Sequence, residues 1–286
     1  MTGDDHALAR DLAGQAGRRL TGLRAQGGDP DVLRKAGDRL SHEFLAAALA
    51  GRRPDDVVLS EEAADNPARL GARRVWIVDP LDGTREFGEP GRTDWAVHVA
   101  LWERGGDGTG QLTAGAVALP AQGEVLSTLE PPAQCDIGPV IAGAMSHRAG
   151  SATSGETAGA DRGDDEPGVS HGRLRIVVSR SRPPGFVRNI SDLLSAELVP
   201  LGSAGAKVAA VIRGEVDAYV HGGGFYEWDT AAPVAVARAA GLHASRIDGS
   251  ALAYNQPDLL MPDILVCRPA VAGTLLQAIR EVTDAP

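Results

Sequence analysis

Apolar residues recur every three or four positions through the first fifty residues of the chain. Leu8, Leu12 and Leu20 fall on one stripe, and the same spacing resumes after Gly27–Pro30 and continues to Gly51. This periodicity places apolar side chains on one face of a helix. Glycine and proline together are typical of a turn. The pattern therefore predicts two amphipathic helices separated by a turn.

The period then changes from that of a helix to that of a strand. Short apolar or alternating runs bounded by turn residues are typical of buried strands. Five such runs follow the two helices, at Val57–Leu59, Val75–Val78, Trp95–Leu101, Ala114–Leu119 and Glu124–Thr128. Helices followed by a series of strands predict an α+β half, with helices packed on a largely antiparallel sheet.

A third region, from residue 149 to residue 172, contains almost nothing to bury. It is rich in Ser, Thr, Gly, Asp and Glu, which predicts a flexible loop or linker. Strands and helices alternate beyond it. Strands are expected at 174–178, 198–201, 216–220 and 264–267, and helices after Pro183-Pro184, at 204–213, at 229–240 and over the last fifteen residues. The sequence thus predicts an α+β half over 1–148 and an α/β half over 173–286.

Composition narrows the class of protein. Hydrophobic residues make up 43% of the 286-residue chain, as in ordinary globular proteins. The net charge of −10 and the aromatic content of 4% argue against binding to a nucleic-acid polymer. The two cysteines have no metal-site spacing, and no apolar run approaches the length of a membrane span. We expect a cytoplasmic protein that does not contact a membrane.

The most informative segment is VWIVDPLDGT at 75–84, where an apolar strand delivers Asp79 and Asp82 at its end. Carboxylates and carbonyls, here including that of Leu81, are ligands that Mg²⁺ prefers. The backbone amides of Gly83 and Thr84 could donate to a phosphate. An aspartate-rich turn after a strand is common, so the motif alone leaves a structural interpretation open.

Two further acidic positions gain meaning beside this motif. Glu61 follows the predicted strand Val57–Leu59, where a solvated loop residue is the alternative interpretation. Asp229 stands at a predicted helix start, where aspartate commonly caps the helix. A cap can still bind a cation through its other oxygen, so the two roles of Asp229 are compatible.

Together these motifs resemble the inositol monophosphatase superfamily of metal-dependent, lithium-sensitive phosphatases. The resemblance covers nearly the whole chain in order. Within this superfamily, a second set of motifs in the chain most resembles the CysQ-like bisphosphate nucleotidase branch. These are Gly202-Ser203, Lys207, GEVDAY at 214–219 and EWDTAA at 227–232.

The resemblance implies a layered α–β–α–β–α sandwich of the sugar phosphatase type and a site that holds two or three Mg²⁺ ions. A first ion would be held by Glu61, Asp79 and the Leu81 carbonyl. A second would lie between Asp79, Asp82 and Asp229, and a third, weaker ion would lie near Glu61. Members are often homodimers, although no stripe in this sequence argues for an interface.

The resemblance also implies that Thr84 positions the attacking water and that Asp38 accepts a hydrogen bond from its hydroxyl. The chain departs from the common pattern here, because Lys35-Ala36-Gly37 precedes Asp38. This departure weakens the assignment of Asp38, for which a polar position on an amphipathic helix is the alternative. Pro233, where many relatives have glycine, is tolerated in the first turn of a helix.

Candidate substrate contacts lie mostly in the second half of the chain. For Arg180 and Lys207 a position on the solvent-exposed surface is the alternative interpretation. Arg180, in the Ser179–Arg182 loop, could grip a second phosphate through its guanidinium or could lie in an exposed basic loop. Lys207 follows Ser203 on a predicted helix and is one of two lysines among 28 cations. A solvated helix lysine is the alternative for Lys207. Glu227 is expected to face the ribose side of the pocket.

The resemblance therefore implies a Mg²⁺-dependent phosphomonoesterase acting on a small phosphorylated molecule. The expected reaction converts 3′-phosphoadenosine 5′-phosphate and water to AMP and phosphate, a step linked to sulfate assimilation. The alternatives are an inositol monophosphatase, a fructose 1,6-bisphosphatase or a promiscuous phosphatase of the same superfamily. A non-catalytic nucleotide or metal sensor would be expected to have lost a ligand, yet Glu61, Asp79, Asp82, Thr84 and Asp229 are all present.

Overall fold

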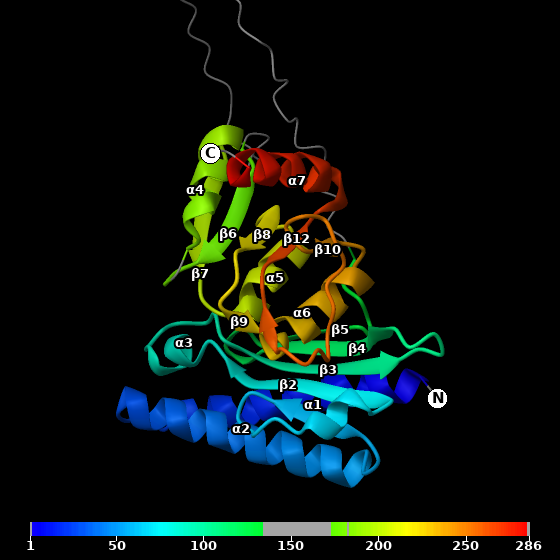
Figure 1. Ribbon diagram of the computed structural model, residues 1–286. Helices are drawn as coiled ribbons and strands as arrows, with labels where there is room; N and C mark the ends of the chain where they lie inside the picture. Colours follow the sequence, from blue (N-terminus) through cyan, green and yellow to red (C-terminus); the bar gives the residue numbers. More distant parts are fainter. Residues whose placement is uncertain (1, 134–172, 182, 285–286) are drawn as a thin grey trace, which may run out of the picture.

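The computed structural model describes residues 2–133, 173–181 and 183–284, so the predicted linker at 149–172 lies outside the described residues. Helices and sheets alternate in five layers, which Figure 1 shows from the blue helices below to the red helix above. This α–β–α–β–α arrangement confirms the predicted fold class. In the part of the chain that is described, no helix has the length and apolarity to cross a bilayer.

The first sheet contains five strands in sequence order. They are β1 (Val57–Ser60), β2 (Arg74–Asp82), β3 (Ala96–Arg104), β4 (Gly110–Leu119) and β5 (Glu124–Ser127). β1 runs parallel to β2, whereas every later neighbour is antiparallel. The sheet is therefore largely antiparallel, as the sequence predicts.

Two long helices, α1 (Thr2–Arg24) and α2 (Pro30–Arg52), cover the outer face of this sheet. Asp29 caps α2 by accepting from the backbone amides of Asp31 and Val32. Alternate residues of β2 then face opposite layers. Trp76 belongs to the core cluster beneath α1 and α2, and Ile77 belongs to the cluster on the other face.

The second sheet is mixed and has the strand order β10-β12-β8-β6-β7. β6 is parallel to both β7 and β8, whereas β12 is antiparallel to β8 and β10. The bounds are β6 (Arg175–Ser179), β7 (Glu197–Leu201), β8 (Ala218–His221), β10 (His243–Ser245) and β12 (Ile264–Cys267). Helices α4 (Gly185–Leu194) and α7 (Pro269–Thr283) cover its outer face.

The central layer consists of α5 (Ala204–Ile212) and α6 (Glu227–Ala239), which lie between the two sheets (Figure 1). One continuous apolar cluster contains Ile77 of the first sheet, Ala209 of α5, Val234 of α6 and Tyr219 of the second sheet. The two sequence halves therefore share one core, and their junction is where the candidate residues meet.

Several short elements escape the sequence patterns because they are too short to show a period. They are α3 (Thr84–Gly88), the paired strands β9 (Phe225–Tyr226) and β11 (Leu260–Met261), the strand β10, and the 3₁₀ turns η1 (Pro67–Leu70) and η2 (Pro120–Gln122). Of these, α3 and β9 matter most for function because they adjoin the DPLDGT and EWD motifs.

Candidate active site

The carboxyl end of β2 carries two buried aspartates on one bulged segment. Asp79 is paired with His98 and Asp82 with Ala96, so β2 has one residue more than β3 between these pairs. The Leu81 amide donates to Asp79 Oδ1 at 3.0 Å. Only 1% of Asp79 and 7% of Asp82 is exposed. The bulge therefore holds both acids away from water.

Asp229 reaches the same point from the opposite half of the molecule. It lies in the first turn of α6, and its Oδ2 accepts from the Tyr226 amide at 2.6 Å. One carboxylate oxygen from each of Asp79, Asp82 and Asp229 lies within 4.8 Å of the others. Asp79 Oδ2 has no hydrogen-bond partner among the described residues. This oxygen-only donor set, in which Asp79 and Asp82 are buried and Asp229 is half-buried, fits a hard divalent cation.

The electrostatics of the cluster support the same conclusion. Burial, together with the charges of Glu61 and Asp82, raises the pKa of Asp79 well above its usual range. Burial and the charge of Asp82 raise the pKa of Asp229 to about 6. The acids therefore destabilise one another's charged forms, and a bound cation would relieve this repulsion.

Asp82 is the exception in the cluster. Burial disfavours its charge, but His98, Lys207 and Ser203 outweigh that effect and lower the pKa of Asp82. Its Oδ2 accepts from Ser203 Oγ at 2.5 Å and from the Gly205 amide at 2.8 Å. Asp82 is consequently held as an ionised carboxylate by protein donors.

Glu61 follows β1 and lies at the edge of this cluster. The residue as a whole is exposed, but the protein around its carboxyl group and the charges of Asp229 and Asp82 raise the pKa of Glu61 to about 8. The structure thus brings Glu61 within electrostatic reach of Asp79, Asp82 and Asp229. Because Glu61 is more exposed than the aspartates, an ion bound through Glu61 would be held more weakly.

Thr84 and Asp38 meet where α2 passes the start of α3. Thr84 Oγ1 lies 3.3 Å from Asp38 Oδ1 and 3.0 Å from the Leu81 carbonyl oxygen, and both oxygens can accept its hydrogen. Burial and the charge of Glu62 raise the pKa of Asp38 to about 7, against the opposing effect of Thr84. The structure therefore forms the Asp38–Thr84 pair that the resemblance implies.

Gly37 explains how this pairing survives the unusual residues before Asp38. A Cβ at position 37 would come within 2.8 Å of the Phe87 ring and 3.0 Å of Leu81. The absence of a side chain lets α2 approach both of them. Gly83, with φ of +83°, begins α3 in a conformation that favours glycine and leads directly into Thr84.

The turn at Gly202-Ser203 supports Asp82 from the second half. Ser203 has φ of +45°, which is rare for a residue with a side chain, and its hydroxyl also accepts from the Ala206 amide. Lys207 Nζ donates to the carbonyl oxygens of Ser203 at 2.7 Å and Gly202 at 3.2 Å. Burial lowers the pKa of Lys207, with Asp82 opposing the shift. Ser203 and Lys207 therefore brace this turn while also lining the pocket.

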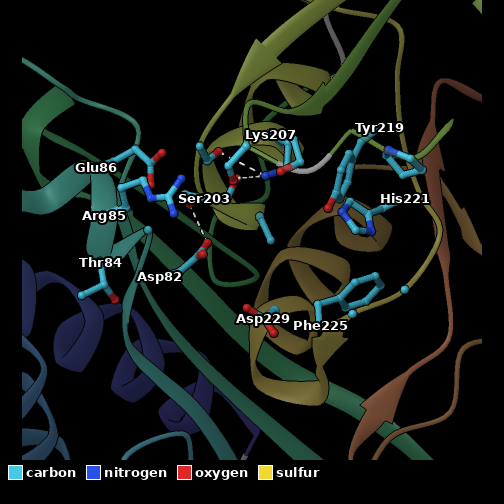
Figure 2. A pocket seen from close by; sticks show the side chains of 18 of the residues that line it. Asp82, Thr84, Arg85, Glu86, Ser203, Lys207, Tyr219, His221, Phe225 and Asp229 are labelled. Atoms are coloured by element: carbon cyan, nitrogen blue, oxygen red, sulfur yellow. Dashed lines mark hydrogen bonds between the residues drawn. The ribbon is translucent and has the colours of Figure 1, made fainter. Parts of the chain in front are cut away.

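A pocket of about 580 Å³ opens above the acids, a volume typical of a small-molecule site. Figure 2 shows Asp82 and Asp229 at its floor, Arg85 beside Ser203, and an aromatic wall opposite. The lining draws on both halves, and its members include Gly83, Thr84, Arg85, Ser179, Ser181, Ser203, Lys207, Tyr219, His221, Phe225 and Asp229.

Arg180 lies differently from the sequence expectation. Its guanidinium donates to Glu86 Oε1 at 2.7 Å and to Glu89 Oε1 at 2.9 Å, so it ties the end of β6 to α3. The described pocket lining includes Ser179 and Ser181 on either side but not Arg180. Arg85 instead contributes a cation to the pocket lining. Its position directly after the DPLDGT motif is the sequence feature that could have identified it.

Glu227 also turns away from the pocket. It is fully buried and accepts from the amides of Asn255 at 2.6 Å and Gln256 at 2.7 Å. Asn255 in turn accepts from Arg69 Nη1 at 2.9 Å, which connects this network to the segment after Glu61. Glu227 therefore holds the start of α6 in place. It is not among the residues that line the pocket, where the sequence placed it on the ribose side.

The chain belongs to the inositol monophosphatase family, whose model matches residues 7–284. Among curated relatives, it is 48% identical to the 3′-phosphoadenosine 5′-phosphate phosphatase of Mycobacterium leprae (strain TN), over 97% of this chain and 94% of that protein. It is 32% identical to the 3′(2′),5′-bisphosphate nucleotidase CysQ of Salmonella typhimurium, over 77% of this chain and 78% of that protein. The predicted family is therefore confirmed.

Solved structures give the same fold. CysQ from Bacteroides thetaiotaomicron matches with a TM-score of 0.68 at 28% identity, over 93% of this chain and 97% of that chain. Inositol monophosphatase II from Staphylococcus aureus MSSA476 matches with a TM-score of 0.72 at 19% identity, over 98% and 96% of the two chains. The latter likeness concerns the fold alone.

Proposed function

We propose that this protein is a Mg²⁺-dependent phosphomonoesterase that removes the 3′-phosphate of 3′-phosphoadenosine 5′-phosphate to give AMP and phosphate. The observation that carries the proposal is the group of Asp79, Asp82 and Asp229 oxygens within 4.8 Å of one another, of which Asp82 and Asp229 line the pocket. Full-length similarity to phosphatases named for this substrate supports the choice of reaction.

Glu61, Asp79, the Leu81 carbonyl, Asp82 and Asp229 are the groups that would hold the ions. Bound Mg²⁺ supplies a Lewis acid for the phosphate and lowers the pKa of an attacking water. Ser203 and Gly205 occupy Oδ2 of Asp82, which leaves its Oδ1 for an ion. The buried oxygens of this set are already oriented before a ligand arrives, so binding requires little reorganisation.

Thr84 is the residue proposed to position the water. When its hydrogen is directed to Asp38, the Thr84 oxygen can accept a hydrogen bond from that water. Asp38, with a pKa near 7, is suited to share the proton at neutral pH. The amides of Gly83 and Thr84, at the start of α3, are proposed to donate to the phosphate.

The remaining walls favour a nucleotide over a simple sugar phosphate. Tyr219, His221 and Phe225 form an aromatic wall, with the His221 and Phe225 ring centroids 5.2 Å apart. Such a surface suits a nucleobase, which offers a π-face for stacking. Arg85, on the opposite side, is proposed to meet the second phosphate.

The test is phosphate release from 3′-phosphoadenosine 5′-phosphate, inositol 1-phosphate and fructose 1,6-bisphosphate, each with Mg²⁺ and with EDTA. We expect Mg²⁺-dependent turnover with a strong preference for the nucleotide, and Asp82→Ala as the inactive control. Equal rates on all three substrates would identify a general phosphatase. No turnover of any of them would overturn the enzyme assignment.

Three finer features belong to the same proposal. They are two or three Mg²⁺ ions per chain, a cytoplasmic location with a role in sulfate assimilation, and assembly as a homodimer. Inductively coupled plasma spectrometry of the protein equilibrated with Mg²⁺ would count the ions, and sedimentation would determine the oligomeric state.

A further inference from the structure

A histidine that the sequence patterns treat as an ordinary strand residue lies directly beneath the acidic cluster. His98 is in the middle of β3, paired in register with Asp79 of β2. None of its surface is exposed. A polar ring this deeply buried needs partners, so its contacts are informative.

The ring of His98 contacts groups from both halves of the molecule. Nε2 lies 3.2 Å from Asp82 Oδ2, and Nδ1 lies 3.9 Å from Asp79 Oδ2. Nδ1 also lies 3.2 Å from the carbonyl oxygen of Trp228, the residue before Asp229. A carbonyl oxygen can only accept, so Nδ1 is the donor in that contact. One side chain thus connects the end of β2 to the start of α6.

Packing fixes the ring in this position. A Cβ at Gly205 would come within 2.2 Å of His98 Nε2, so α5 closes over the ring at a residue without a side chain. Ser203 and Gly205, which donate to Asp82 Oδ2, come from the same end of α5. His98 therefore occupies the junction of β2, β3, α5 and α6.

We infer that His98 is a positioning residue that sets the separation between the cation ligands of the two halves, Asp79 and Asp82 on one side and Asp229 on the other. Groups that orient metal ligands from behind commonly contribute a factor of about 10–100 to metal affinity. The inference rests on the metal site of the proposed function and deepens it, because it explains how ligands from separate elements keep one geometry.

The experiment measures Mg²⁺ affinity of the full chain by calorimetry and by the shift of its melting temperature, without substrate. His98→Asn places an amide near the position of Nδ1, and His98→Gln places one near the position of Nε2. Each variant therefore keeps one of the two contacts. Val99→Ala is the matched control because Val99 is fully buried on the opposite face of the same strand.

We expect both His98 variants to bind Mg²⁺ about 10–100-fold more weakly than the wild type. Val99→Ala should lower the melting temperature yet keep wild-type Mg²⁺ affinity. Wild-type affinity in both His98 variants would overturn the inference while leaving the proposed function intact. A wild type that does not respond to Mg²⁺ would overturn the metal-dependent function and this inference together. A comparable loss of affinity in Val99→Ala would show that any packing defect in β3 weakens Mg²⁺ binding, and it would also overturn the inference.

Discussion

The floor of the pocket and the frame behind its walls differ in how they use charge. At the floor, Asp82 and Asp229 line the pocket and form with Asp79 a group of carboxylate oxygens within 4.8 Å of one another. Behind the walls, Arg180 and Glu227 lie outside the pocket lining, and Glu86 and backbone amides satisfy their charges within the protein. The comparison shows that residues next to a site divide into those that face a ligand and those that hold the frame.

This division has a physical basis in desolvation. A buried charge is costly unless a partner compensates it. Glu227 and Arg180 have protein partners, so a substrate would have to compete for them. Asp79 lacks a partner for Oδ2 among the described residues, which leaves that oxygen for an ion. Substitutions at the floor should therefore alter chemistry, and those at the frame should alter stability.

The largest effect is expected from Asp79→Asn. Loss of a ligand that supports several kcal/mol of transition-state stabilisation should reduce kcat/KM by about 10³-fold or more. Removal of a buried charge repelled by Glu61 and Asp82 should raise the melting temperature of the EDTA-treated protein. Steady-state kinetics and thermal melts measure the two effects. A variant with near wild-type turnover would show that the floor does not perform the chemistry.

Thr84→Val should reduce kcat by roughly 10²-fold, because it removes the hydroxyl that lies between Asp38 and the Leu81 carbonyl. Thr84→Ser keeps the hydroxyl and is the matched control, with turnover close to that of the wild type. Equal activity of the valine and serine variants would remove Thr84 from the reaction.

Mg²⁺ should stabilise the protein, and more strongly at pH 8 than at pH 6. At about 100 times the dissociation constant the gain is about 2.7 kcal/mol, or roughly 5–10 °C in melting temperature. The pKa values of Glu61 and Asp229 are raised to about 8 and about 6. At these two groups the native metal-free protein therefore binds more protons than the unfolded chain, and their contribution to its stability falls as pH rises from about 4 to about 8.

Mg²⁺ binds only the deprotonated ligands, so its affinity rises over the same pH range. The stabilisation by Mg²⁺ therefore increases as the metal-free protein loses stability. Differential scanning calorimetry with Mg²⁺ and with EDTA at both pH values measures the difference. A Mg²⁺ effect that is larger at pH 6 would contradict the expected sign.

Glu227→Gln should lower stability by about 1–3 kcal/mol and leave KM almost unchanged. A glutamine has one acceptor oxygen, so the amide of Asn255 or of Gln256 would face an NH₂ group. Urea unfolding at pH 8 is suitable, since burial raises the pKa of Glu227 to about 7. Glu43→Gln is the control, because Glu43 is an exposed residue of α2 whose ion pair with Arg39 has a separation of 4.0 Å. A large rise in KM without loss of stability would return Glu227 to the substrate side.

The smallest effect is expected from Arg180→Gln. Its partly exposed ion pairs with Glu86 and Glu89 should contribute little to stability, and KM should change little. Arg85→Gln, which removes the cation that lines the pocket, should instead raise KM for the bisphosphorylated nucleotide. The opposite ranking of the two variants in substrate kinetics would restore the original expectation for Arg180.

Local patterns predicted the two outer helices, the first sheet and the alternating strands and helices of the second half, whereas the five-layer arrangement and the grouping of Asp229 with Asp79 and Asp82 were implied by the family resemblance. Asp79 and Asp82 follow one another on a single strand, and periodicity placed that strand in the core. The partners of Arg180 and Glu227 could not be predicted, because Glu86 and Asn255 are distant in the sequence and their pairing depends on tertiary packing. His98 gave no local signal, since an alternating strand admits a histidine at a buried position as readily as a hydrophobic residue.

The central helix layer has a consequence for co-translational folding. The first sheet, with Asp79 and Asp82, is translated well before α6, which covers its inner face and carries Asp229. An unfinished chain therefore has an uncovered apolar sheet and an incomplete ligand set. The ligand set of Asp79, Asp82 and Asp229 is complete only after α6 has been synthesised and has packed against the inner face of the first sheet.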